Sequence, residues 1–201
     1  MQINQFLNDN IALLVQAKAP AALWLAHLGT DPAPTYERVF VNPAGLLDWR
    51  MDNGHSLYEK LNPRLLYQHW IPKDKMEGGA TVIVGAGIGY AVNHLLTHTP
   101  ASHRILVVEP RPEMLLACLG QTDYRPFFKS GRLAFLPPDP GLVEKAVSGL
   151  DVSFLYARIN LHSDLASKQM GPECSRSTSL VQAKLENLAV ELSTLRFKQE
   201  T

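Results

Sequence analysis

The sequence predicts an α/β protein, a Rossmann-like doubly wound parallel sheet preceded by a small N-terminal module of one helix and a β-hairpin. Two observations support this fold. The apolar run 80–84 ends in three alternating glycines, Gly85, Gly87 and Gly89, and a segment of helix length follows them. A second apolar run, 104–108, then ends in Glu109, 24 residues beyond Gly85. This order is typical of a strand, loop, helix and strand at the carboxyl edge of a parallel sheet.

The glycine loop is the first candidate binding site. Gly85 takes backbone angles that a side chain forbids, and Gly87 and Gly89 leave room for a ligand or for the following helix. Glu109 follows the second strand, where a carboxylate can bind a ribose diol. We therefore name Gly85, Gly87, Gly89 and Glu109 as ligand-binding candidates. The competing interpretation is that the glycines serve only a tight turn and that Glu109 is solvated.

The details of the loop favour one class of ligand over another. A dinucleotide site needs a small residue where this chain has Tyr90. The pattern Gly-x-Gly-x-Gly fits a loop for S-adenosylmethionine better than one for NAD. Asp139, the expected N-cap of a helix after the third strand, would then lie near the adenine and is the fifth candidate. A methyltransferase that uses S-adenosylmethionine is therefore one of two functional hypotheses.

The first third of the chain has a different pattern. Ile3 to Val15 show helical spacing, which predicts a helix ending near Lys18. We expect residues 20–34 to form a loop. Segments 37–41 and 46–51 are short strand candidates around the turn 42–45. Asn62 before Pro63 predicts a helix start, with Leu65, Leu66, His69 and Trp70 facing inward.

From residue 80 onward, strands and helices alternate, as in a doubly wound sheet. The expected elements are strand 80–84, helix 88–98, strand 104–109, helix 113–120, strand 132–136, helix 140–147 and strand 151–156. Residues 161–178 are expected to form a loop. Helix 180–195 carries an apolar stripe, so we expect Leu185, Leu188 and Leu192 to pack against the sheet or a second copy of the chain. The expected division is 1–76 for the N-terminal module and 77–201 for the Rossmann-like domain.

Composition excludes several functional classes. Of 201 residues, 46% are hydrophobic and 19% are charged, so the chain is globular. Its formal charge is zero, which argues against a nucleic-acid partner. It has no export signal and no apolar run long enough to span a membrane, so we expect a cytoplasmic protein. Cys118 and Cys174 are then reduced thiols.

Catalytic and metal-binding patterns are absent from the sequence. His94 and His98 share a helix face, but a zinc site needs a third ligand and no such motif accompanies them. The chain has no nucleophile elbow and no Walker sequence. We therefore assign no catalytic residue, no metal and, outside the methyltransferase hypothesis, no cofactor.

Three motifs in a fixed order resemble a known family. They are Leu57-Tyr-Glu-Lys-Leu-Asn-Pro-Arg, Val82-Ile-Val-Gly-Ala-Gly-Ile-Gly-Tyr and Val107-Val-Glu-Pro-Arg-Pro-Glu. Their order and spacing resemble the N-terminal region of the motility-associated factor (Maf) glycosyltransferases, over roughly residues 35–120. Tyr90, which is unsuited to a dinucleotide site, matches that pattern.

The resemblance implies a function but no catalytic residues. Maf proteins attach nonulosonic, sialic-acid-like sugars to flagellin in the bacterial cytoplasm, and their transferase chemistry lies in a second domain. Such a domain opens with a strand and a Gly-Pro-Ser-Leu-type loop, which this sequence lacks. The resemblance therefore implies an accessory domain for assembly or acceptor recognition, inactive alone, whose partner is flagellin or a C-terminal catalytic domain. A homodimer is a further expectation.

Overall fold

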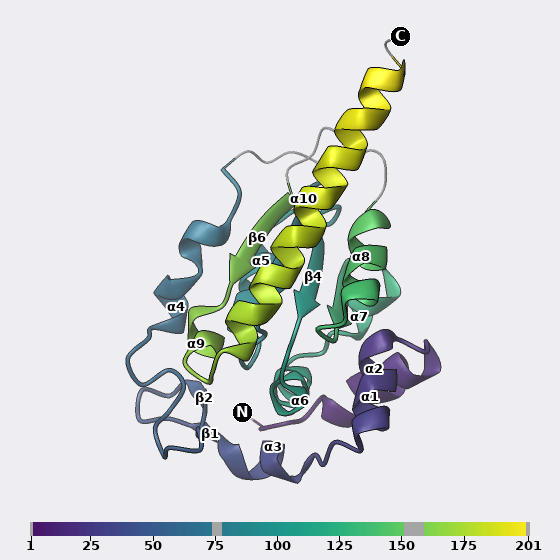
Figure 1. Cartoon of the computed structure of the whole chain (residues 1–201). Coiled ribbons are helices and arrows are strands. Elements are labelled where there is room, and N and C mark those ends of the chain that lie inside the picture. Colours follow the sequence, from purple (N-terminus) through teal and green to yellow (C-terminus); the bar gives the residue numbers. More distant parts are fainter. Residues whose placement is uncertain (1, 74–77, 151–158, 200–201) are drawn as a thin grey trace.

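A four-stranded parallel sheet forms the centre of the molecule. The computed structural model describes residues 2–73, 78–150 and 159–199 (Figure 1). The sheet has the order β5-β4-β3-β6, and its strands are β3 (Ala80–Val84), β4 (Arg104–Val108), β5 (Leu133–Leu136) and β6 (Ile159–Ser163). The chain runs outward from β3 through β4 to β5 and then returns to the other side of β3 at β6. The fold is therefore Rossmann-like, and its switch in strand order lies beside the loop after β3.

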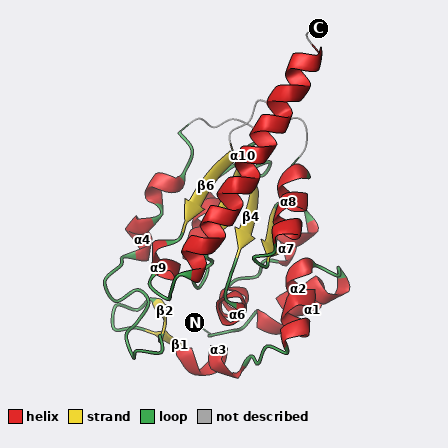
Figure 2. Cartoon of the chain, viewed as in Figure 1, coloured by secondary structure: helices red, strands yellow, loops and turns green. Residues whose placement is uncertain are grey.

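Helices cover both faces of the sheet (Figure 2). On one face, Val82, Val84 and Leu106 pack against α8 (Pro140–Ser148) and α10 (Glu173–Gln199). On the other face, Ile83 and Val107 pack with α5 (Tyr90–His98) and with helices from the N-terminus. Successive strand residues point to opposite faces, so a run of apolar residues fits a strand that is buried on both sides.

The N-terminal segment is more helical than the sequence predicts. Helix α1 (Leu7–Gln16) agrees with the prediction, but the loop expected over 20–34 is wrong. This segment contains α2 (Pro20–Leu28) and the start of α3 (Ala33–Arg38). Pro20 occupies the first turn of α2, where proline costs no hydrogen bond, and Gly29 caps the helix in the left-handed conformation. Both α1 and α2 contribute to the core that covers the second face of the sheet.

The predicted hairpin and the helix start at Asn62 are confirmed. Strands β1 (Val39–Val41) and β2 (Leu47–Trp49) pair antiparallel. Asn62 caps α4 (Pro63–Leu66) through a hydrogen bond from the Arg64 amide, and the 3₁₀ helix η1 (Gln68–Trp70) follows. The predicted inward face is wrong in two positions, since Leu65 is 60% exposed and His69 is exposed as well. Tyr67 is buried instead.

The hairpin lies against the carboxyl edge of the sheet. Trp49 and Leu57 pack in one cluster with Ile88 of the glycine loop and Met114 of α6 (Pro112–Gln121). This contact brings the segment after β2 next to the loop that the sequence identifies as a candidate site. The division between residues 76 and 77 stays a prediction.

The last third of the chain departs most from expectation. The expected strand 151–156 lies outside the described residues. The expected loop 161–178 is wrong, because it holds most of β6, all of α9 (Leu165–Lys168) and the start of α10. Earlier in the chain, between α6 and β5, helix α7 (Arg125–Lys129) is also an element that the sequence patterns do not predict. Leu185 and Leu188 of α10 pack against the sheet-side cluster, as predicted.

In the part of the chain that the structure describes, no helix on its own has both the length and the apolar character needed to span a membrane; α1 and α2 meet that test only as a pair bent by 107°.

Candidate functional site

The glycine loop lies where the sequence places it, between β3 and α5. Gly85, Gly87 and Gly89 have φ angles of +89°, +51° and +100°, in the region that favours glycine. Residues 85–89 form one continuous buried run. A nucleotide cradle normally presents its backbone to a cleft. Here the loop faces protein.

Side chains of the protein itself occupy the space that the glycines leave. A Cβ atom on Gly85 would lie 2.5 Å from Cβ of Ser167. A Cβ atom on Gly87 would meet the Tyr58 hydroxyl and would lie 3.3 Å from Oδ2 of Asp164. On Gly89 it would lie 2.6 Å from the hydroxyl of a buried tyrosine, Tyr124. The close approach that the sequence predicts is real, but residues from distant segments make it.

Four amide groups of the loop, those of Gly85, Ala86, Gly87 and Gly89, already have partners. The Ala86 amide donates to Oε2 of Glu109 at 2.5 Å, and the Gly87 amide donates to Oγ of Ser167 at 3.2 Å. Gly85 donates to the carbonyl of Val108 at 2.9 Å, and Gly89 donates to that of Ala86 at 3.0 Å. A phosphate at this loop would need the same donors.

Glu109 lies at the end of β4, as predicted, but beneath the loop. The residue is 1% exposed. Besides the Ala86 amide, it accepts a hydrogen bond of 2.8 Å from the Arg111 amide. Burial raises the pKa of Glu109 to about 8, the two amide hydrogen bonds oppose the rise, and nearby Asp164 adds to it. Glu109 therefore ties the glycine loop to the turn after β4.

Asp164 is a member of the site that sequence reasoning missed. It follows β6, and its Oδ2 accepts hydrogen bonds from the Ser167 amide at 2.9 Å and from the Ser167 hydroxyl at 2.7 Å. The Tyr67 hydroxyl donates to Oδ1 at 2.7 Å. Burial raises the pKa of Asp164, and these hydrogen bonds partly offset that effect. The pattern Asp164-Leu-Ala-Ser167 is a helix-start signal that is present in the sequence.

Tyr58 closes the loop from the side of the hairpin. The residue is 3% exposed, and its hydroxyl is buried without a hydrogen-bond partner among the described residues. Burial raises its pKa, and the negative charge of Asp164 raises it further. Tyr58, Asp164 and Ser167 together fill the loop from two segments that sequence patterns do not connect with it.

Asp139 lies in a different environment from the other four candidates. It caps α8 by accepting a 2.8 Å hydrogen bond from the Leu142 amide, as the sequence predicts. It is exposed and lines an open cavity of about 510 Å³ together with Trp24, His27 and Pro137. The structure therefore joins Gly85, Gly87, Gly89 and Glu109 in one buried network, and the described contacts of Asp139 belong to the start of α8.

His94 and His98 face each other along α5, with ring centres 4.3 Å apart. Burial lowers the pKa of His94, and His98 lowers it further. Within the described residues, no group of three or more histidine, cysteine, aspartate or glutamate side chains is arranged to hold a metal ion.

Comparison with known proteins identifies a similar fold. No protein-family model and no curated protein matches the chain. Among solved structures, the Maf glycosyltransferase from Magnetospirillum magneticum AMB-1 matches 88% of this chain with a TM-score of 0.55 and 17% sequence identity. The match covers 35% of that protein, so the chain spans about a third of its length. The chain therefore has the fold of a Maf-like domain.

Proposed function

We propose that this chain is an accessory, non-catalytic domain of a Maf-type glycosyltransferase. The complete enzyme would attach nonulosonic sugars to flagellin. The role of this chain would be assembly of the enzyme or recognition of the flagellin acceptor. The observation that carries this proposal is the filled glycine loop. Tyr58 and Ser167 occupy the space beside Gly85 and Gly87, and the amides of Ala86 and Gly87 are hydrogen-bonded within the chain. The loop thus acts as architecture rather than as a cradle for an activated sugar.

Sugar transfer would then require a second domain. This division fits a chain that spans about a third of the similar Maf protein. The activity of the complete enzyme, its flagellin partner, its role in motility and its place in the bacterial cytoplasm belong to the same proposal.

An activity assay tests the accessory role. The isolated chain is incubated with flagellin and an activated nonulosonic sugar, and transfer is followed by intact-mass spectrometry. We expect no transfer by the chain alone. Surface-bound flagellin monomers should retain the chain if it recognises the acceptor. Robust transfer by these 201 residues would overturn the non-catalytic role.

The alternative ligand, S-adenosylmethionine, rests on the Gly-x-Gly-x-Gly pattern and Glu109. Binding in the loop would require Tyr58 and Ser167 to move and their buried contacts to break. Calorimetry with S-adenosylhomocysteine separates the two hypotheses. Micromolar binding that is lost in Glu109→Gln, with the melting temperature kept, would favour a methyltransferase. Absence of heat at the same concentrations supports the structural role of the loop.

A further inference from the structure

Two histidines lie one turn apart near the end of α5. His94 and His98 are separated by four residues, so their side chains lie on the same face of the helix. Their ring centres are 4.3 Å apart, and the ring planes are tilted by 35°. Helix α5 covers the face of the sheet opposite α10 (Figure 1), where Val92 and Leu95 are fully buried. The core therefore holds the backbone that carries the pair.

The ring of His98 has one nitrogen fixed by the backbone. Its Nδ1 lies 2.8 Å from the carbonyl oxygen of His94. A carbonyl oxygen only accepts, so Nδ1 carries the hydrogen and Nε2 of the neutral ring carries a lone pair. Histidines that bind metals are usually oriented in this way, by an N–H of the other nitrogen that donates to a carbonyl or carboxylate oxygen. The hydrogen bond therefore prepares His98 to act as a metal ligand.

The ring of His94 has a nitrogen that lacks a partner. Its Nε2 is buried and makes no hydrogen bond to any described residue. Buried polar atoms in native proteins nearly always have a partner, and a bound ion or water molecule is a common explanation where the protein supplies none. The neighbouring ring of His98 is exposed, so an ion can reach the pair from solvent. The unpaired nitrogen points to a ligand independently of the spacing of the two rings.

We propose that His94 and His98 bind one divalent transition-metal ion through Nε2 of each ring, with water completing its coordination. Imidazole nitrogen suits Ni²⁺, Cu²⁺ and Zn²⁺. An ion about 2.0–2.1 Å from a nitrogen of each ring needs ring centres no more than about 6 Å apart, and this pair meets that condition. The pair also lies at the carboxyl end of α5, where the helix dipole favours a cation.

This site differs from the zinc sites whose absence the sequence predicts. Structural zinc sites use four protein ligands and catalytic ones use three, whereas this pair supplies two. The remaining positions of the ion are left to water. The bound ion joins two successive turns of α5 and stabilises the folded chain, because it binds the folded state in preference to the unfolded one. The site lies beyond the glycine loop along α5 and does not depend on the proposed accessory role.

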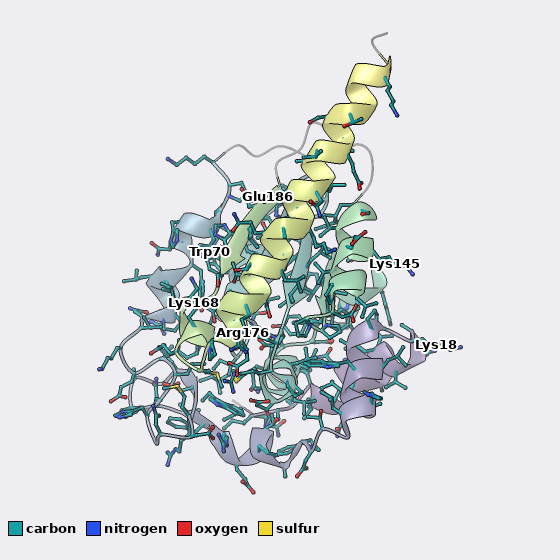
Figure 3. All side chains as sticks on the ribbon, viewed as in Figure 1. Lys18, Trp70, Lys145, Lys168, Arg176 and Glu186 are labelled. Atoms are coloured by element: carbon teal, nitrogen blue, oxygen red, sulfur yellow. The ribbon has the colours of Figure 1, made fainter. Side chains whose placement is uncertain are left out.

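A second pair of histidines provides the control. The ring centres of His69 and His162 are 6.5 Å apart, beyond the separation that one ion can bridge. Trp70, labelled in Figure 3, stacks on His162 with ring centres 4.5 Å apart. His69 is exposed, so His69→Ala removes an imidazole without disturbing the core. An ion held by this second pair would be lost in that variant.

Isothermal titration of the untagged 201-residue chain with nickel chloride tests the proposal. We expect one ion per chain with a micromolar dissociation constant. His94→Ala and His98→Ala should each weaken binding about tenfold or more, because even an outer-shell partner of a metal ligand contributes about that much. His69→Ala should bind as the wild type does. Nickel should raise the melting temperature of the wild type but of neither variant at the pair. Magnesium chloride, whose ion prefers oxygen ligands, should give no heat.

The exposed position of His98 keeps the test valid if His94→Ala, at a partly buried position, folds poorly. Circular dichroism of each variant without metal checks its fold. Wild-type binding weaker than about 1 mM would overturn the proposal. So would binding that a correctly folded variant of the pair leaves unchanged. Binding that only His69→Ala removes would also refute it and assign the ion to the pair at His162.

Discussion

The hydroxyl of Tyr67 donates a 2.7 Å hydrogen bond to the carboxylate of Asp164, and both residues are buried beside the glycine loop. The two residues are 97 positions apart in the sequence. Their contact joins the segment after the hairpin to the end of β6. The glycine loop lies against Asp164, so this pair helps to hold the loop closed.

Removing the donor should therefore destabilise the whole domain. Tyr67→Phe leaves Asp164 buried with one acceptor unpaired, which should cost about 1–3 kcal/mol of unfolding free energy. Urea denaturation followed by circular dichroism measures the change. Tyr36→Phe, at a tyrosine that is 54% exposed, is the control and should cost less than about 0.5 kcal/mol. Equal stability of the two variants would contradict the role of this hydrogen bond.

A side chain at Gly87 should clash with Tyr58. Gly87→Ala combines a positive φ with a collision at the Tyr58 hydroxyl, so we expect a loss of more than about 2 kcal/mol. Gly45→Ala is the matched control, because Gly45 has φ +73° but no atom lies within 4 Å of the place that an added methyl group would take. It should lose only the backbone cost of about 1 kcal/mol.

A double variant then isolates the collision. Tyr58→Phe removes a hydroxyl that has no described hydrogen-bond partner, so it should be nearly neutral alone. Combined with Gly87→Ala, it should recover part of the lost stability. Strict additivity of the two changes in urea denaturation would show that the hydroxyl is not the obstacle.

The sequence predicts β3, β4 and β5 well because these three strands carry strong local signals. The runs before Gly85 and Glu109 are continuously apolar, as strands buried on both faces require. Helix α2 escapes prediction because Pro20 is typical of loops, although proline also starts helices. Strand β6 escapes it because Asn160 and His162 interrupt its apolar pattern.

The sequence predicts the glycines and Glu109 of the candidate site but not the residues that fill it. Four of its members follow one another within 25 residues and form a familiar pattern. The residues that fill the loop, Tyr58, Asp164 and Ser167, come from segments on either side of it. Side chains that converge from such distances leave no periodicity in the sequence, so a pattern typical of ligand binding does not reveal that the protein itself occupies the space.

The raised pKa of Glu109 predicts a pH dependence of stability. The folded state holds its proton up to a pKa of about 8, whereas the unfolded chain releases it near the ordinary value of 4.5. Between these values the native state binds more protons, so the free energy of unfolding should fall as pH rises from about 5 to 8. The raised pKa of Asp164 acts in the same direction from its own ordinary value upward.

Glu109→Gln tests this assignment. Glutamine resembles the protonated carboxyl and does not ionise, so the variant should lose stability less steeply over the same pH range. Glu186→Gln, an exposed residue, should retain the wild-type slope. Urea denaturation at intervals from about pH 5 to 8.5 gives both slopes. An unchanged slope in Glu109→Gln would assign the pH dependence to another group.

The packing of α10 gives a last prediction, with a control on the same helix. Val181 is 0% exposed against the sheet-side cluster, whereas Val190 is 66% exposed. Val181→Ala should cost about 1–3 kcal/mol through lost burial and the cavity that remains. Val190→Ala changes helix propensity but removes little buried surface, so it should stay within about 0.5 kcal/mol of wild type.

Truncation after Ser179 removes Val181, Leu185 and Leu188 together and should lower the melting temperature sharply or make the chain insoluble. A truncated chain that melts at the wild-type temperature would show that α10 adds nothing to the stability of the sheet.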